Sequence, residues 1–426
     1  MKKRYLNIYK ISLIIFTSLV VILSSVLIYR AYYEKLPGSI ILETKKEQIL
    51  SYNLPISGEV YVETTSKAIS ELDFYNDVTL VASTPQNYFI KTKLFGLIPL
   101  KTVDVSVINE VSIIPLGVPV GIYANTDGLL VVQTGEFENN SGDKCSPCEK
   151  VVYPGDYILK INGVELENKY QLVTAIQDCD GESQILTVER DEEIFEVEVV
   201  PKKNEAGEYK LGVWIKDNAQ GIGTLTFVTA QGEFGALGHG IVDLDIQEIL
   251  EIKSGNLYKA EILAIKKSKK GSPGEMTGVI FYGQEPLGEI TGNLKTGIFG
   301  QYDLNKMDYI TKSMKENKAP EGMEIGYKNE VREGTAKILC TIDGETQYFD
   351  ITIDKISMNS SNVNKSMKIT VTDEKLLSLT GGIVQGMSGS PIIQDGKIVG
   401  AVTHVLVNDP ARGYGIFIEN MLEHDN

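Results

Sequence analysis

The amino terminus of the chain begins with a long apolar segment. The residues from about Ile11 to Tyr29 contain no charged side chain, and they follow a basic stretch that ends at Lys10. A run of roughly 19 apolar residues suits a helix that spans a bilayer, and basic residues ahead of it favour a cytoplasmic amino terminus. We therefore expect residues 1–35 to form a cytoplasmic basic stub and a transmembrane signal-anchor, with the rest of the chain outside the cytoplasm.

The next region alternates short hydrophobic runs with turn residues. Residues 58–63 and 78–82 are rich in valine, tyrosine and threonine, and polar residues separate them. Such runs are typical of short β-strands. We expect residues 36–104 to form a β-rich spacer region, in which no catalytic chemistry is visible.

A different pattern of elements follows in residues 105–202. Residues 153–163 give a turn, a strand and an Asn-Gly hairpin signal. Residues 169–177 read as a short amphipathic helix, and residues 183–200 as two strands joined by a charged turn. Together these elements resemble a PDZ domain, a fold that binds an extended peptide by adding it to a sheet as a further strand.

A glycine-bearing loop precedes those elements. It lies within residues 115–122, and its centre is Leu116, Gly117 and Val118. Backbone N–H groups in such a loop can hold the terminal carboxylate of a peptide. We take these three residues as the candidate peptide-binding loop of the PDZ-like domain.

The remaining region, residues 203–426, contains many short strands separated by glycine turns, with one helical run near residues 304–318. This pattern fits two β-barrels arranged as in chymotrypsin, so the fold class is mostly β with some α: an N-terminal membrane helix, a PDZ-like domain and a chymotrypsin-like double β-barrel peptidase domain. The expected strands cover residues 222–228, 260–265, 277–282, 336–342, 347–353, 366–372 and 397–406.

The strongest chemical signal is a serine in a glycine-rich turn, in the run that extends from Gly386 to Pro391. Ser388 lies between small, flexible neighbours, so its hydroxyl can be exposed as a nucleophile. By analogy with the chymotrypsin turn, the N–H groups of Gly386 and Ser388 would form the oxyanion hole. Ser390 is a rival nucleophile, but the proline that follows it restricts its backbone.

A serine nucleophile needs a base, and the chain has three histidines. His239 is preferred because glycines on both sides let another segment approach its ring. His404 lies in an apolar strand-like run after the serine and is a candidate substrate-site residue. His424 lies in the polar C-terminal tail.

A catalytic triad also needs a carboxylate that holds the imidazole in the productive tautomer. Asp373 follows a strand-like run and precedes Ser388 by fifteen positions. Asp243 and Asp245 are close to His239 in sequence. Spacing alone leaves all three open.

The motifs around the serine and the glycine-flanked histidine carry a family resemblance. Residues 229–240 and 386–391, continuing through 400–404 to 408–410, are similar to the stage IV sporulation protein B (SpoIVB) serine peptidases of spore-forming bacteria. The resemblance extends over essentially the whole chain. It implies a triad of His239, Asp373 and Ser388, and so it selects Asp373 among the three carboxylates.

The same resemblance implies a biological role. Members are secreted from the forespore into the space between the two membranes around it. There they cleave the extracytoplasmic part of a membrane-bound regulator of an intramembrane protease, in a signalling cascade that activates a late sigma factor. Self-cleavage is also expected, for which residues 34–46 offer a flexible segment.

Composition limits the partners. A formal net charge of −16 argues against nucleic acid or anionic lipid headgroups as the main partner. Cys145 and Cys148 form one Cys-x-x-Cys pair without a second pair or a nearby histidine, which is a weak metal signal. We therefore assign no metal and no cofactor, and leave open whether this pair forms a disulfide. The alternative function is a non-catalytic, membrane-tethered PDZ scaffold.

Overall fold

The structure is a computed structural model and describes residues 2–50, 52–62, 67–109, 111–314 and 320–423. Part of the helical run expected at residues 304–318, the last residue of the run at 58–63, and His424 fall outside the described residues. The expected fold class is confirmed: the chain is mostly β, with one long helix at its amino terminus.

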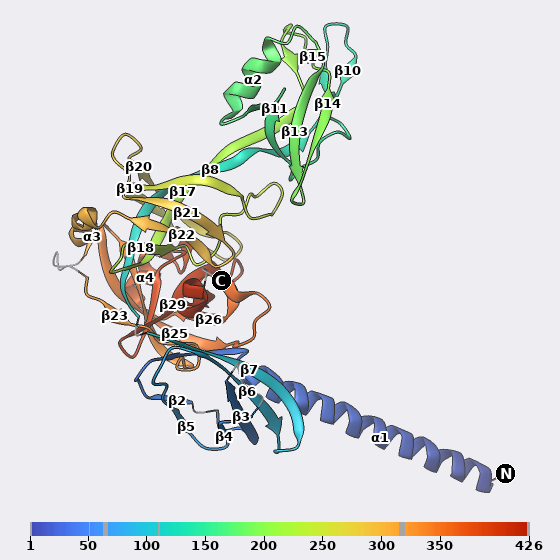
Figure 1. Ribbon diagram of the computed structural model, residues 1–426, viewed down its shortest axis with the longest axis vertical. Helices are drawn as coiled ribbons and strands as arrows, with labels where there is room; N and C mark the ends of the chain where they lie inside the picture. Colours follow the sequence, from blue (N-terminus) through green and yellow to red (C-terminus); the bar gives the residue numbers. More distant parts are fainter. Residues whose placement is uncertain (1, 51, 63–66, 110, 315–319, 424–426) are drawn as a thin grey trace.

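The amino-terminal helix α1 (Lys2–Lys35) projects away from the rest of the molecule (Figure 1). Its segment from Tyr9 to Lys35 is long and apolar enough to cross a membrane, and an 18-residue window within it has a mean hydropathy of 2.7 and no buried residue. An isolated helix that exposes apolar side chains all round is stable only in an apolar surrounding such as a bilayer. The helix therefore supports membrane anchoring.

A small β-unit follows the helix, in the region where the sequence predicts a β-rich spacer. Its five-stranded sheet has the order β1-β7-β6-β3-β4, and β2 pairs separately with β5. The core contains Leu50, Phe74 and Ile90, all nearly inaccessible to solvent. The strands are β1 (Ser39–Glu43), β2 (Gln48–Leu50), β3 (Ile56–Val62), β4 (Ser70–Asp73), β5 (Val78–Leu80), β6 (Asn87–Leu94) and β7 (Ile98–Ile108).

The first barrel of the peptidase region is built on two long strands, β8 (Ser112–Thr134) and β17 (Val213–Thr229). Among the described residues, six strands close a ring in the order β8-β17-β18-β22-β21-β19, because β19 pairs back with β8. Apolar side chains from every strand fill this ring. The other four strands are β18 (Glu233–Ala236), β19 (Ile252–Lys266), β21 (Gly288–Leu294) and β22 (Gly297–Tyr302).

The second barrel follows the first in sequence. Within the described part of the chain it closes in the order β24-β25-β26-β30-β29-β28. Its strands are β24 (Gly334–Ile342), β25 (Glu345–Ile356), β26 (Met367–Val371), β28 (Pro391–Gln394), β29 (Lys397–Val405) and β30 (Arg412–Phe417). The two barrels together give the chymotrypsin-like arrangement expected from the sequence.

Short elements connect or flank the barrels. Strand β20 (Gly274–Ile280) pairs with β19 of the first barrel and, in parallel, with β27 (Val384–Gln385) just before the serine turn. The remaining elements in this region are η1 (Leu304–Lys306), α3 (Met307–Ser313), β23 (Met323–Glu324), η3 (Val363–Lys365), α4 (Glu374–Thr380) and α5 (Ile418–Leu422).

The PDZ-like unit lies at the end of the molecule opposite the small β-unit (Figure 1). The far halves of β8 and β17 continue out of the first barrel into it, where β8 pairs with β11. Its helix has the bounds expected from the sequence. The elements are β9 (Phe137–Glu138), β10 (Lys144–Cys145), β11 (Tyr157–Ile161), β12 (Val164–Glu165), α2 (Lys169–Gln177), β13 (Gln184–Arg190), β14 (Glu193–Val199), β15 (Lys202–Lys203) and β16 (Tyr209–Lys210).

The course of β8 bears on the expected domain boundaries. Residues 113–126 of this strand pair with strands of the first barrel, although they lie inside the segment 105–202 that the sequence assigns to the PDZ-like domain. Pairing with strands that are distant in sequence decides to which domain these residues belong, and the local sequence does not indicate that pairing. We propose that the PDZ-like unit is an insertion in the first barrel. The chain leaves the barrel along the second half of β8 and returns to it along the first half of β17.

Candidate active site

Ser388 lies on a tight turn between β27 and β28. Gly386 and Gly389 have φ values of 102° and 96°, which glycine adopts without strain. The Met387 side chain between them is fully buried. The turn is fixed by its own backbone, since the Gly389 N–H donates to Val402 (2.7 Å) and the Ser390 N–H donates to Met387 (3.0 Å). The turn therefore presents the Ser388 side chain while its neighbours are held in place.

Thr224 of the first barrel clamps this turn from outside. Its hydroxyl donates to the Gly386 carbonyl (2.7 Å), and its N–H donates to the Ser388 carbonyl (3.2 Å). A side chain at Gly389 would place its Cβ 2.2 Å from the Thr224 carbonyl oxygen. Gly389 is therefore required for close contact between the two barrels at the serine.

The amides expected to form an oxyanion hole are not used elsewhere. In the ranges that the structure describes, neither the Gly386 N–H nor the Ser388 N–H donates a hydrogen bond to a protein acceptor. Both residues are half-buried and line the cavity, so a bound substrate can reach these donors. Two free donors flanking a nucleophile are thus a suitable place for a developing oxyanion.

His239 follows strand β18 of the first barrel, after two residues in the left-handed conformation. Leu237 and Gly238 both have φ of 68°. A Cβ at Gly238 would lie 3.1 Å from Thr403 and Ile416, and one at Gly240 would lie 2.6 Å from the Leu294 carbonyl oxygen. The flanking glycines therefore allow both barrels to approach the histidine segment closely.

The environment of the imidazole fixes its tautomer. Nδ1 of His239 lies 2.9 Å from the Gly240 carbonyl oxygen. Because a carbonyl oxygen only accepts hydrogen bonds, Nδ1 carries the proton and Nε2 keeps a lone pair. Burial lowers the pKa of His239 below its ordinary value of 6.5, and the Gly240 contact opposes this shift. The ring is therefore neutral at neutral pH, as a general base must be.

Ser388 and His239 line the same cavity, which has a volume of about 540 Å³ and lies between the two barrels. His404 lines it too, with its ring centroid 5.2 Å from that of His239. Burial and the positive charge of a protonated His239 lower the pKa of His404 to about 4. In this arrangement the Ser388 hydroxyl donates to the Thr403 carbonyl (2.7 Å).

Asp373, the carboxylate that the family resemblance assigns to the triad, has other hydrogen-bond partners in this structure. It caps helix α4, where Oδ1 accepts the Leu376 N–H (2.9 Å) and Oδ2 accepts the Asp350 N–H (3.3 Å). It does not line the cavity. The part of Asp373 in the triad therefore stays a prediction. A carboxylate ahead of a helix serves equally well as a cap, and spacing does not separate the two roles.

The competing carboxylates are also engaged elsewhere. Asp243 and Asp245 both accept the Lys216 ammonium group, at 2.7 and 2.6 Å. Ser390, the rival nucleophile, is fully buried. In this structure the Gly240 carbonyl, which sequence reasoning missed because backbone groups leave no motif, takes the orienting position.

The expected peptide-binding loop needs a correction. Leu116 and Val118 are fully buried in the core of the first barrel. A Cβ at Gly117 would lie 2.4 Å from the Leu339 carbonyl oxygen of the second barrel. These residues are part of a barrel strand, so they do not hold a peptide carboxylate in the PDZ-like unit.

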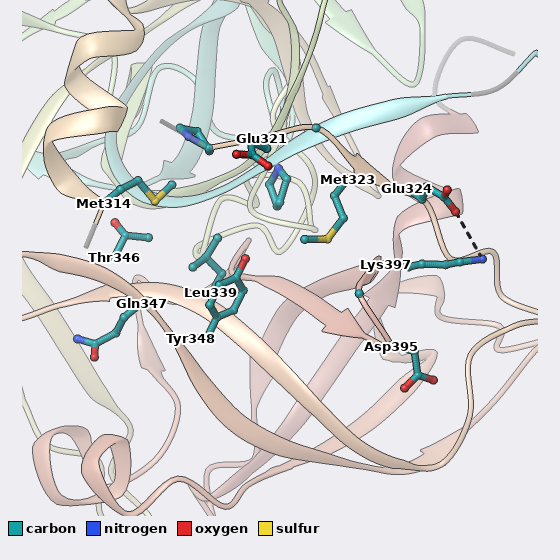
Figure 2. A pocket seen from close by; sticks show the side chains of 14 residues that line it. Met314, Glu321, Met323, Glu324, Leu339, Thr346, Gln347, Tyr348, Asp395 and Lys397 are labelled. Carbon is teal, nitrogen blue, oxygen red and sulfur yellow. Dashed lines mark ion pairs between the residues drawn. The ribbon is translucent and has the colours of Figure 1, made fainter. Parts of the chain in front are cut away.

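A larger groove lies away from this chemistry. It has a volume of about 840 Å³ and is lined by Met314, Met323, Leu339 and Tyr348, with the ion pair between Lys397 and Glu324 at its edge (Figure 2). Neither His239 nor Ser388 lines it. The smaller cavity is therefore the candidate active site.

The side chains that could bind a metal and the cysteines lie as follows. Over the described residues, no group of three or more histidine, cysteine or acidic side chains could hold a metal ion. All four cysteines are free thiols. Cys148 is buried, which raises the pKa of its thiol to about 12 and makes it unreactive.

Two β-barrels with a serine and a neutral histidine at the cavity between them define the class of serine peptidases. The chain belongs to the SpoIVB peptidase S55 family, whose sequence model matches residues 207–422. The matched region follows a helix that is apolar enough to span a membrane, and it overlaps the two barrels described above.

Other similarities are more distant. The chain is 28% identical over 143 residues to the probable membrane metalloprotease ARASP2, chloroplastic, of Arabidopsis thaliana, covering 31% of this chain and 30% of that protein. It is also similar to the PDZ domain of the SdrC-like protein from Listeria monocytogenes, with 15% identity and a TM-score of 0.18. That match covers 21% of this chain and 87% of the PDZ domain. It is similar as well to a structure described as HtrA-type protease AlgW with decapeptide. That match has 11% identity and a TM-score of 0.28, and it covers 49% of this chain and 52% of that chain.

Proposed function

We propose that this protein is an extracytoplasmic serine endopeptidase that cleaves a membrane-bound regulatory protein in a sporulation signalling cascade. The observation that carries the proposal is the cavity shared by Ser388 and His239, with two free amides beside the serine. The family supports the substrate: the extracytoplasmic part of a regulator of an intramembrane protease, cleaved in the space around the forespore so that a late sigma factor becomes active.

The proposed mechanism begins with a rotation of the Ser388 side chain. The hydroxyl leaves the Thr403 carbonyl, which it contacts at 2.7 Å, and turns toward Nε2 of His239. Nε2 removes the hydroxyl proton while Oγ attacks the carbonyl carbon of the scissile bond. The N–H groups of Gly386 and Ser388 stabilise the resulting oxyanion.

The same groups complete the reaction. The imidazolium returns the proton to the leaving amine as the peptide bond breaks, which leaves an acyl group on Ser388. Water then gives a proton to His239 and attacks the acyl carbon. Ser388 leaves with that proton, so the peptidase is regenerated and one peptide bond has been hydrolysed. The Gly240 carbonyl holds the ring throughout by accepting the Nδ1 proton.

The walls of the cavity favour an uncharged substrate segment. Its described lining contains no lysine, arginine, aspartate or glutamate, and its apolar side chains include Ile122, Ile222, Leu237 and Val384. A charged side chain would lose hydration there without gaining a partner. We propose that apolar residues flank the scissile bond, and that the PDZ-like unit holds a peptide or a C-terminal tail.

Peptide hydrolysis by the full chain in detergent tests the proposal. Wild type is expected to cleave an apolar peptide, and Ser388→Ala is expected to be inactive. Ser390→Ala is the matched control, because that serine is buried two positions away, and it should retain activity. If wild type cleaves no peptide, the non-catalytic scaffold function replaces this proposal, and if Ser388→Ala cleaves as fast as wild type, Ser388 is not the nucleophile.

A further inference from the structure

The turn between β6 and β7 exposes three large apolar side chains. Phe95, Leu97 and Ile98 are 58%, 83% and 50% exposed, and they belong to one turn. Phe95 and Gly96 have φ values of 53° and 71°. Tight hairpin turns of this kind favour asparagine or aspartate ahead of glycine, and a phenylalanine there is strained. The turn thus places an exposed phenylalanine where its backbone is strained, although an asparagine or aspartate would form the same turn without that strain.

This turn lies beside the end of the membrane helix. The rings of Tyr32 and Phe95 are in edge contact, with centroids 6.3 Å apart. The Tyr29 hydroxyl donates to the carbonyls of Pro99 and Leu100, both at 3.2 Å. In Figure 1 the ends of β6 and β7 lie next to the base of α1. The apolar turn is therefore fixed at the level of the last turns of the helix.

That level corresponds to a membrane surface. Tyr29 and Tyr33 are four residues apart, about 6 Å along the helix axis. Tyrosines at the end of an apolar helix mark the boundary between hydrocarbon and water. An apolar turn held at this boundary contacts lipid when the helix spans the bilayer.

The charges behind the turn are paired with one another. Lys91, Lys93 and Lys101 lie on β6 and β7, and Lys93 pairs with Glu59 at 2.5 Å. The Lys91 ammonium group lies 4.8 Å from the centre of the Tyr61 ring. Glu59 and Glu71 occupy paired positions on the same face as Lys91, so the charges there offset one another, and the apolar side chains of the turn carry the inference.

We infer that Phe95, Leu97 and Ile98 insert into the outer interface of the bilayer that α1 spans. The small β-unit then has two attachments to the membrane. This goes beyond the proposed peptidase function and does not depend on it. Transfer of these apolar side chains from water into lipid is favourable, and it fixes the orientation of a unit that α1 already tethers.

The β-unit passes this orientation to the barrels through buried polar contacts. Lys328 forms a buried ion pair with Glu419 at 2.8 Å and donates to the Ser39 hydroxyl of β1 at 2.9 Å. The Tyr327 hydroxyl donates to the Glu43 carboxylate at 3.0 Å. Membrane contact at the turn therefore sets the height of the cavity above the bilayer.

Fluorescence quenching by brominated lipids tests the inference on the full chain in vesicles. Trp214 is the one tryptophan, so Trp214→Phe gives a dark background. Leu97→Trp and Ile98→Trp are then introduced separately. Ile69→Trp is the matched control, since Ile69 is 57% exposed and lies toward the opposite end of the same sheet.

Insertion predicts a blue-shifted emission for Leu97→Trp and Ile98→Trp, and a loss of about half or more of it in brominated lipid, as for side chains about 5–10 Å into the interface. The Ile69→Trp variant should keep its emission. Equal quenching at positions 97 and 69, in variants with the same melting temperature, would overturn the inference. Equal quenching is also the result expected if the turn binds a protein partner instead of lipid.

Discussion

The two barrels hold their catalytic segments in different ways. In the second barrel, the positive φ values around Ser388 fall on glycines, and the backbone of the turn bonds to its own barrel. In the first barrel, the segment before His239 includes Leu237 at φ 68°, a strained conformation for a leucine. The serine turn therefore avoids backbone strain and has bonds to its own barrel as well as to Thr224, whereas the histidine segment is strained and depends more on support from the other barrel.

That support comes from the second barrel. The Asn364 side-chain amide donates to the Gly238 carbonyl (2.6 Å) and to the Lys295 carbonyl (2.7 Å). Asn364 is itself held, because its carbonyl accepts the Thr403 hydroxyl at 2.6 Å. One hydrogen-bonded chain thus links the residue that contacts Ser388 to the segment that carries His239. The comparison teaches that docking of the barrels sets the position of the base.

Removing the base should have the largest effect. His239→Gln keeps a polar side chain of similar size but cannot accept the Ser388 proton. We expect kcat to fall by about 10⁴ or more, measured by peptide hydrolysis. His404→Gln is the matched control. A larger loss of kcat in that variant than in His239→Gln would show that His404, and not His239, is the base.

Acidification should act through the same group. Burial lowers the pKa of His239 below 6.5. The neutral ring is the active form, so activity is full above this lowered pKa and falls as the pH drops through it, about tenfold per unit. The acid limb of kcat/KM should therefore have its midpoint below 6.5. A midpoint above that value would contradict the burial of the imidazole.

Asn364→Ala should weaken the base without removing it. The change leaves the buried Gly238 carbonyl without its donor, which costs about 1–3 kcal/mol, or roughly 10–100-fold if it is expressed in kcat. KM should change little. Asn362→Ala is the control, because Asn362 caps the same short helix η3 without contacting Gly238. An equal kcat loss in both variants would indicate local unfolding instead of positioning.

Gly221→Leu should change substrate preference. A Cβ at Gly221 meets no atom within 4 Å, and this residue lines the cavity. A leucine there should lower kcat/KM for large apolar residues at the scissile bond by about 10-fold, as expected for lost space in an apolar pocket. Substrates with alanine should be cleaved as before. Parallel losses for both substrates would show that the cavity does not select the side chain.

The smallest effect is expected at Asp373. Asn caps helices about as well as Asp, so Asp373→Asn should change kcat no more than a few-fold. Asp373→Ala should lower the free energy of unfolding by about 1 kcal/mol. A loss of about 10⁴ in Asp373→Asn would instead show that this carboxylate reaches His239 in the active state.

Local patterns allowed much of the fold to be predicted. The helix Lys169–Gln177, the hairpin that follows it and the barrel strands depend on periodicity and turn residues, which each segment carries itself. The structure also places Ser388 and His239 at one cavity. Both belong to glycine-rich runs, where a backbone constraint leaves a visible signal.

The sequence failed where distant pairing decides the outcome. Leu116 to Val118 look like a loop before an edge strand, but β8 runs through the first barrel and buries them. Asp373 has a suitable position in the chain and caps α4 here, and its part in the triad stays a prediction. The Gly240 carbonyl and the Asn364 amide leave no recognisable motif, because their roles exist only once the barrels are docked.

The most direct test of the account is covalent labelling of the full chain with a fluorophosphonate, followed by mapping of the modified peptide. We expect a single adduct on Ser388, formed rapidly in wild type and at least about 10³-fold more slowly in His239→Gln, since the histidine activates the serine. An adduct on another serine, or equal labelling rates in wild type and His239→Gln, would contradict a nucleophile and a base that meet across the two barrels.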